Sequence, residues 1–226
     1  MDNFPGQKKH IINPIYKKIN RLPKVKSNES VNGIYYRNLR WEKSKFNYPN
    51  MVSIETIGDG SCLFHSILMS FFKPYQFNHV DRKKYAREFR RNLASELRRY
   101  YDKISEGQLY ELSKSFPKLK LENMEKELDS SKSVDQIYNE FISDIVNMDI
   151  YLLNAKNKDV NMVGTTNIYK NRVSAVILFT PGTGEIGHYE LIGVMESERK
   201  LKLSFEPSHP IIQKIQQRMR EIIENK

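Results

Sequence analysis

The stretch Gly58-Asp-Gly-Ser-Cys-Leu-Phe-His65 decides how this chain is interpreted, because it places the single cysteine, Cys62, directly after a glycine-containing turn. Ser61 is a residue type that often caps the first turn of a helix. Apolar residues then recur at helical spacing, which predicts a helix over residues 62–72. These apolar positions are Leu63, Ile67 and Phe71.

A cysteine at the first turn of a helix is typical of a nucleophile. The partial positive charge of a helix N-terminus favours the thiolate over the thiol. The thiolate is the form that attacks a carbonyl carbon. Glycines in the preceding turn let backbone N–H groups face a developing oxyanion. Cys62 is therefore the predicted nucleophile.

A thiol enzyme of this kind also needs a base, and His188 is the best candidate among the five histidines. It follows the loop 180–187, which contains three glycines, and it begins a predicted strand over 188–195. Because alternate residues of a strand share a face, Glu190 should lie on the same side as His188, and Tyr189 should point away. Glu190 is the predicted acid that orients the imidazole.

Helical patterns come mostly early in the chain and strand patterns mostly late. This order predicts an α+β fold, a mixed α/β sandwich in which a small central β-sheet is flanked by helices. A capping-box pattern at Ser133–Gln136 predicts the start of one helix. The predicted helices are 62–72, 80–101, shorter segments within 106–128, 133–147 and 209–224, and the predicted strands are 150–154, 160–163, 173–179, 188–195 and 200–205.

The net charge of +10 is concentrated at one end of the chain. Residues 1–50 carry 11 Lys and Arg against three acids, whereas the remainder is close to neutral. We therefore expect a basic extension over residues 1–45, serving as a targeting or partner segment, and a folded domain over 46–226. Nucleic-acid binding, if present, should reside in the extension.

Cysteine usage and hydropathy indicate the class of protein and its compartment. One cysteine cannot form an internal disulfide, and cysteine-based zinc sites need several ligands, so we expect a reducing compartment, cytoplasmic or nuclear. No stretch approaches the length of a transmembrane helix, and the N-terminus lacks the apolar core of a signal peptide. We expect a monomer that needs no metal or cofactor and binds no membrane.

At two places the sequence resembles the ovarian-tumour (OTU) family of cysteine deubiquitinases. Asp59-Gly-Ser-Cys-Leu-Phe64 is similar to the family signature Asp-Gly-x-Cys-Leu-Phe. Gly187-His-Tyr-Glu-Leu-Ile192 resembles the second signature, a histidine followed by an aromatic residue and then usually Asp or Asn. The resemblance covers about residues 50–205 and extends to the OTU proteins of large DNA viruses, which would place the protein in a host cell. It implies the papain-like architecture of OTU proteases.

The resemblance also implies an activity, the hydrolysis of isopeptide bonds after the C-terminal glycine of ubiquitin. Cys62 would attack the carbonyl and His188 would shuttle the proton. Asp59 would shape the loop before the cysteine, and Glu190 departs from the family by one methylene. The implied oxyanion and channel residues are Gly60, Ser61, Gly187 and Tyr189.

The implied partners are ubiquitin, polyubiquitin chains or ubiquitin-like modifiers. Two alternatives stay open: a catalytically weak ubiquitin-binding module on the same fold, and a basic protein that binds nucleic acid through its extension. A papain-type site is disfavoured because it would have Cys-Gly-Ser-Cys-Trp around its nucleophile. A phosphatase loop would need arginine where Leu68 stands, and a thioredoxin-like site would need a second cysteine.

Overall fold

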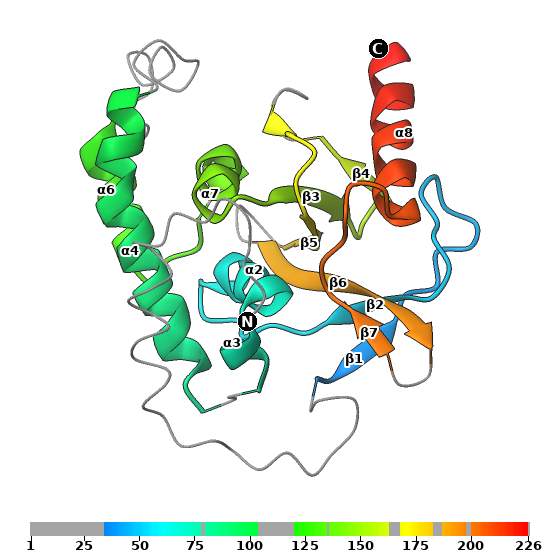
Figure 1. Ribbon diagram of the computed structural model, residues 1–226, viewed down its shortest axis with the longest axis horizontal. Helices are drawn as coiled ribbons and strands as arrows, with labels where there is room; N and C mark the ends of the chain where they lie inside the picture. The colour runs from blue at the N-terminus through cyan, green and yellow to red at the C-terminus, as the bar shows by residue number, and fades with distance from the viewer. Residues whose placement is uncertain are drawn as a thin grey trace.

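The computed structural model describes residues 34–77, 80–103, 120–134, 136–162, 168–182, 187–197 and 200–225. In these ranges the chain forms one mixed β-sheet with helices on both of its faces (Figure 1). This is the α+β sandwich that the sequence predicts, and the sheet is open rather than closed into a barrel. None of the helices in the described ranges is both long and apolar enough to cross a membrane.

The sheet of the described residues has seven strands in the order β1-β2-β6-β5-β3-β4, with β7 added beside β6. Only β3 and β5 are parallel to each other, and the other pairs are antiparallel. The central strands are buried on both faces, which explains their nearly continuous apolar sequences. The strands are β1 (Tyr36–Asn38), β2 (Met51–Ile54), β3 (Asp149–Asn154), β4 (Asp159–Asn161), β5 (Ser174–Pro181), β6 (Gly187–Ser197) and β7 (Lys200–Lys202).

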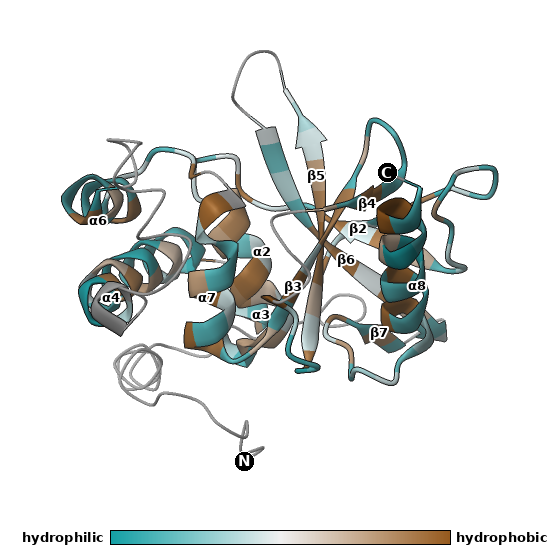
Figure 2. Cartoon of the chain, turned by 90° about the horizontal axis from the view of Figure 1, so that it is seen from above, coloured by the Kyte–Doolittle hydropathy of each residue, from teal (hydrophilic) through white to brown (hydrophobic). Residues whose placement is uncertain are grey.

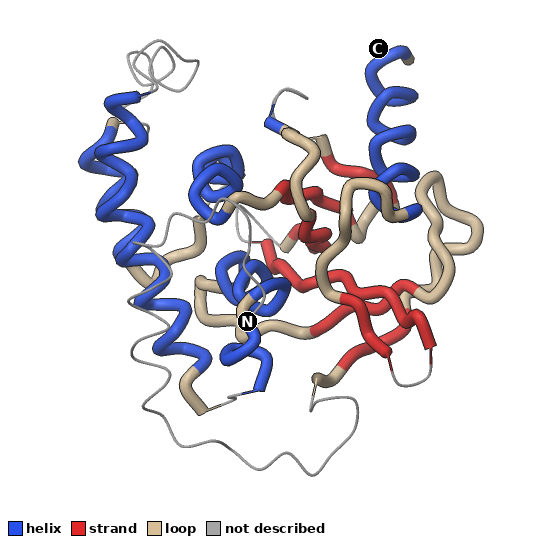
Figure 3. Tube along the Cα trace, viewed as in Figure 1, coloured by secondary structure: helices blue, strands red, loops and turns tan. Residues whose placement is uncertain are grey.

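Helices cover the two faces of the sheet unequally, as the view from above shows (Figure 2). One face carries most of the helices and the larger apolar core. Among the helices that the structure describes, α8 alone lies over the other face, where the second, smaller core is found. The tube in Figure 3 shows the same layers as helix, strand and loop. The helices are α2 (Cys62–Phe71), α3 (Lys73–Phe77), α4 (Arg82–Lys103), α6 (Leu121–Asp129), the 3₁₀ turn η3 (Gln136–Tyr138), α7 (Asn139–Val146) and α8 (Pro210–Glu224).

Helix α2 is buried along its whole length, which explains why its sequence is apolar on more than one side. Its polar residues are satisfied inside the core. The Ser66 hydroxyl donates to the Cys62 carbonyl at 2.9 Å, and the Ser70 hydroxyl donates to the Ile67 carbonyl at 2.7 Å. A helix surrounded in this way holds its first residue in a fixed position.

Two local predictions are corrected by the structure. The capping box at Ser133–Gln136 does not start a helix, because the chain first forms η3 and α7 begins only at Asn139, without a side-chain cap. Ser61 precedes α2 but its side chain makes no capping hydrogen bond. The helical segments expected within 106–128 are described only from residue 120 on, where α6 is found, and the rest lies outside the described residues.

Residues 34–45, which the sequence assigned to the basic extension, are part of the folded domain. Strand β1 pairs with β2, so that Arg37 lies opposite Ser53. Trp41 is 6% exposed and Phe46 is fully buried in the core beneath α8. Basic composition concealed these contacts, because exposed cations alternate with apolar side chains that face inward. Residues 1–33, the rest of the expected extension, lie outside the described residues.

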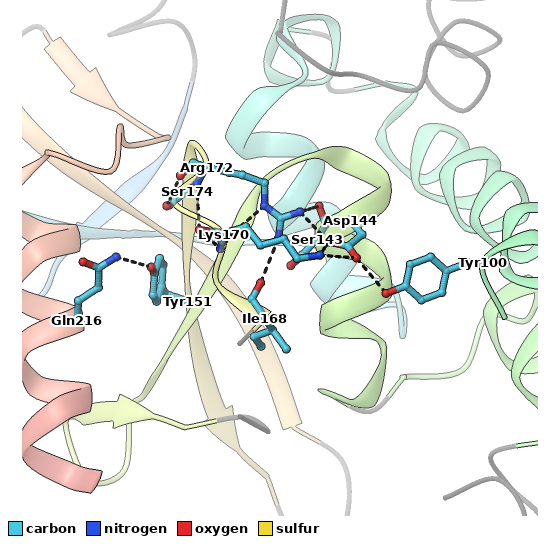
Figure 4. A network of polar contacts seen from close by, with 10 residues as sticks. Tyr100, Ser143, Asp144, Tyr151, Ile168, Lys170, Arg172, Ser174 and Gln216 are labelled. Atoms are coloured by element: carbon cyan, nitrogen blue, oxygen red, sulfur yellow. Dashed lines mark hydrogen bonds and ion pairs between the residues drawn. The ribbon is translucent and has the colours of Figure 1, made fainter. Parts of the chain in front are cut away.

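A polar network joins α7 to the start of β3 and to the segment before β5 (Figure 4). Arg172 donates to Asp149 at 2.7 Å and to Asp144 at 2.8 Å. Lys170 Nζ donates to Asp144 at 2.7 Å, and the Tyr100 hydroxyl donates to the same carboxylate at 3.1 Å. Burial raises the pKa of Asp144, but these hydrogen bonds outweigh it and hold that pKa below its usual value.

Candidate active site

Cys62 is the first residue of α2 and lies near the end of β2, where the pairing of β2 with β6 stops. The pairing of β2 with β6 ends at Ile54 opposite Leu191, after which the chain leaves the sheet. The backbone N–H of Tyr189, beyond that point on β6, donates to the Cys62 sulfur instead. The fold thus brings the predicted nucleophile into contact with the residue that follows His188, although Cys62 and His188 are far apart in the sequence.

The Cys62 thiol is buried, and its side chain environment favours the neutral form. Only 4% of the residue is exposed. Burial raises the pKa of the thiol above its ordinary value and Asp59 adds to this, whereas backbone N–H groups of Tyr189, Leu63 and Cys62 itself lower it. The sequence predicted that the helix N-terminus would favour the thiolate, but desolvation outweighs that effect here. A base is therefore needed to remove the proton.

The turn before Cys62 depends on glycine. Gly60 has φ of +79°, a conformation that residues with a side chain rarely adopt. A Cβ at this position would lie 2.1 Å from the Ser131 carbonyl oxygen. The turn is therefore pressed against the segment that follows α6, and a larger residue would displace one or the other.

Asp59 organises this turn through its side chain. Its Oδ1 accepts the Ser61 N–H at 3.1 Å and faces His65 Nε2 at 3.1 Å. The Ser61 N–H, an expected oxyanion donor, is therefore occupied in this conformation. The backbone N–H groups directed at the sulfur are those of Cys62 and Leu63 at the start of α2, together with that of Tyr189 on β6. Asp59 thus links Ser61 and His65 within the loop before Cys62.

His65 anchors Asp59 from inside the core. It is fully buried, and its Nδ1 lies 2.5 Å from the Tyr75 hydroxyl. Burial lowers the pKa of His65, with Asp59 opposing, so the neutral imidazole is favoured. In the tautomer that satisfies both contacts, Tyr75 donates to Nδ1 and the Nε2–H donates to Asp59. His65 therefore holds the turn in place rather than serving as a base.

Arg90 is a residue of the site that the sequence reasoning missed. It is 1% exposed and its guanidinium lies 4.7 Å from the ring centroid of Phe64. Burial lowers the pKa of Arg90, and Asp59 and Glu127 oppose that shift. Its spacing was a usable signal, because an arginine four residues after Ala86 falls on the apolar face of α4. Its guanidinium donates to Gly60 O and Ser61 Oγ at 3.0 Å and to Leu128 O, Glu127 O and Lys132 O at 2.8 Å.

His188 and Glu190 lie on one face of β6, as alternation predicts, but they are not hydrogen-bonded in this conformation. His188 Nε2 and Glu190 Oε1 are 4.0 Å apart. Glu190 Oε2 instead accepts from Arg37 Nη2 at 2.6 Å and from the Ser53 hydroxyl. The His188 side chain is 36% exposed and Glu190 only 8%, so the imidazole is accessible and its carboxylate neighbour is covered.

Two predicted channel residues have a packing role in the described conformation. Tyr189 is 5% exposed and its ring lies 5.1 Å from that of Phe179. A Cβ on Gly187 would collide with the Phe179 ring at 2.0 Å. Tyr189 contributes its backbone N–H to Cys62, while its side chain belongs to the core. Within the described ranges, no group of three or more His, Cys, Asp or Glu residues is placed to hold a metal ion.

Comparison with solved structures identifies the architecture around this site. An OTU domain solved in complex with ubiquitin aligns with 77% of this chain and 86% of its own length, at a TM-score of 0.50 and 18% sequence identity. The chain has the fold of an OTU domain. The OTU domain of OTUD1 aligns with 63% of the chain and 85% of its own length, at a TM-score of 0.40 and 16% identity. No protein-family model and no curated protein matches the sequence.

The OTU fold explains why the two signature segments meet. Its mixed sheet places the start of β6 beside the N-terminus of α2, which are the segments that carry His188 and Cys62. The resemblance inferred from the sequence is thus confirmed at the level of the fold.

Proposed function

We propose that this protein is a thiol-dependent deubiquitinase that hydrolyses isopeptide bonds after the C-terminal glycine of ubiquitin. One observation carries the proposal: the Cys62 sulfur, at the N-terminus of α2, accepts a hydrogen bond from the residue next to His188. The OTU fold supports it, and one OTU domain of this fold was solved with ubiquitin bound.

In the proposed reaction, His188 removes the proton from the Cys62 thiol, and the sulfur attacks the glycine carbonyl. The oxyanion that forms is stabilised by backbone N–H groups at the start of α2. The imidazolium then gives its proton to the departing lysine amine as the C–N bond breaks. Water, activated by the same imidazole, cleaves the resulting thioester and releases the ubiquitin carboxylate and the free thiol.

The described conformation requires a small rearrangement before this reaction. A productive hydrogen bond between the imidazole and its orienting acid spans about 2.6–3.2 Å. The observed separation of His188 Nε2 and Glu190 Oε1 is 4.0 Å, so a shift of about 1 Å would close it. Substrate-free sites often tighten in this way when the substrate binds.

The burial of Cys62 favours one alternative, a ubiquitin-binding module with little or no catalysis. A thiol that is 4% exposed and has a raised pKa is a poor nucleophile unless substrate binding uncovers and activates it. Both functions share the fold and the partner, and they differ in whether a thioester can form.

A ubiquitin probe with a C-terminal propargyl group separates these possibilities, because only a reactive thiol forms a covalent adduct. We expect the wild type to form the adduct, and Cys62→Ala to bind ubiquitin without forming it. Binding with no adduct would instead establish the ubiquitin-binding module. Neither binding nor adduct, with matched probes for ubiquitin-like modifiers also negative, would refute both.

A further inference from the structure

We propose that Arg37 is a positioning residue for His188, and that it acts through Glu190. The inference rests on the proposed function, since it assigns a role within the same site. Arg37 lies in β1, a strand from the segment that composition assigned to the extension. Its Nη2 donates to Glu190 Oε2 at 2.6 Å across a sequence separation of 153 residues.

The two donors to Glu190 converge on the same oxygen. Both Arg37 Nη2 and the Ser53 hydroxyl donate to Oε2, which leaves Oε1 directed toward His188 Nε2. Two bonds to one oxygen restrict rotation of the carboxylate, because turning it would break both. Arg37 and Ser53 thus select which oxygen faces the imidazole.

The sheet register produces this arrangement. Arg37 pairs with Ser53, and Ser53 pairs with Ile192, so these three residues share one face of neighbouring strands. Alternation along β6 places Glu190 and His188 on that face as well. Arg37 therefore reaches the carboxylate across β2, the strand that lies between β1 and β6.

Charge gives Arg37 a second effect on the site. Glu190 is 8% exposed, and burying a carboxylate without a cation is costly, so the ion pair with Arg37 offsets part of that cost. The same cation offsets part of the negative charge that His188 experiences. The groups placed beside His188 are Glu190 on its own strand and the uncharged Thr180 opposite it on β5, and Cys62 on α2 contacts the backbone of the next residue, Tyr189.

Removing Arg37 should change the chemistry more than the binding or the fold. In Arg37→Gln the carboxylate loses its fixed orientation, and we expect kcat on a ubiquitin fluorogenic substrate to fall roughly five- to twenty-fold with KM nearly unchanged. Glu190 then stabilises the imidazolium more strongly. The acidic limb of the pH–rate profile should therefore move to higher pH by about half a unit.

The experiment compares the wild type with Arg37→Gln, Arg37→Lys and the control Arg40→Gln. Arg37→Lys should recover most of kcat, because the lysine ammonium keeps the positive charge and can still donate a hydrogen bond to Glu190. Arg40 is exposed on the same segment and has no ion-pair partner in the described part of the chain, so its variant should behave as wild type. The Arg37 side chain is 62% exposed, so its variants should remain folded, which a thermal melt checks.

A second readout does not depend on ubiquitin. Because Cys62 is the single cysteine, its alkylation by iodoacetamide can be followed by mass across pH without ambiguity. A more strongly stabilised imidazolium favours the adjacent thiolate, so the midpoint of that profile should shift downward in Arg37→Gln by about half a unit. A wild type without turnover would refute the proposed function, yet the alkylation profile would still test Arg37. Unchanged kcat and unchanged alkylation in folded Arg37→Gln would overturn the inference.

Discussion

Replacing Arg90 with methionine tests whether one buried cation holds the turn before the nucleophile. Methionine fills similar space but removes all the donors. The five hydrogen bonds of the guanidinium would be lost, four of them to backbone carbonyls. Those carbonyls are at Gly60, Leu128, Glu127 and Lys132, so the variant loosens the turn and the end of α6 together.

The expected cost follows from opposing terms. Hydrogen bonds from a charged donor contribute about 1.5–3 kcal/mol each. Their sum overstates the loss, because burying a guanidinium costs several kcal/mol that the variant no longer bears. Removing one member of such a buried network typically costs about 3–5 kcal/mol, which we expect for Arg90→Met. Arg90→Lys keeps the charge and up to three donors, so about 2–3 kcal/mol should be lost.

Urea unfolding followed by circular dichroism measures these values. The dependence of the unfolding free energy on urea concentration must be the same for each variant, so that a change in the midpoint reports a change in stability. The matched control is Arg91→Met on the next position of α4. Its ion pair with Asp129 is 3.6 Å long and both side chains are mostly exposed, so a change within about 0.5 kcal/mol is expected. If Arg90→Met unfolds within about 1 kcal/mol of the wild type, the assigned role of Arg90 is wrong.

Further predictions concern the turn, the catalytic pair and acid stability. Gly60→Ala should destabilise the fold by at least about 2 kcal/mol, because position 60 has a positive φ and the added Cβ would clash with Ser131. The same variant should slow alkylation of Cys62. A wild-type unfolding free energy together with a wild-type alkylation rate would contradict this prediction. His188→Ala should abolish turnover of a ubiquitin fluorogenic substrate about as fully as Cys62→Ala, since a catalytic pair acts as a unit. A half-active His188→Ala would exclude it as the base. Asp144 has a lowered pKa, so its stabilising contribution is present above its ordinary value of 3.8 and disappears as pH falls below it. Between about pH 5 and pH 2, the free energy of unfolding of Asp144→Asn should therefore fall less steeply than that of the wild type.

Local patterns were sufficient to predict the elements that carry the candidate site. Turn chemistry and helical spacing located Cys62 at the start of a helix, where α2 begins. Alternation placed His188 and Glu190 on one face of a strand. These features depend on neighbouring residues, so they can be recognised before the fold is known. The capping box at Ser133 failed because the tertiary context there favoured a 3₁₀ turn instead.

Tertiary structure alone decided which distant groups meet and how burial changes them. The contact of Arg37 with Glu190 spans 153 residues and that of Arg90 with Gly60 spans 30, and neither leaves a local pattern. Burial of Cys62 reversed the expected effect of the helix N-terminus on its pKa. Sequence by itself thus determined the chemical groups and the elements that bear them, because periodicity and turns are local. Their distances, solvent exposure and protonation depend on the packing of the whole sheet, which only the folded chain defines.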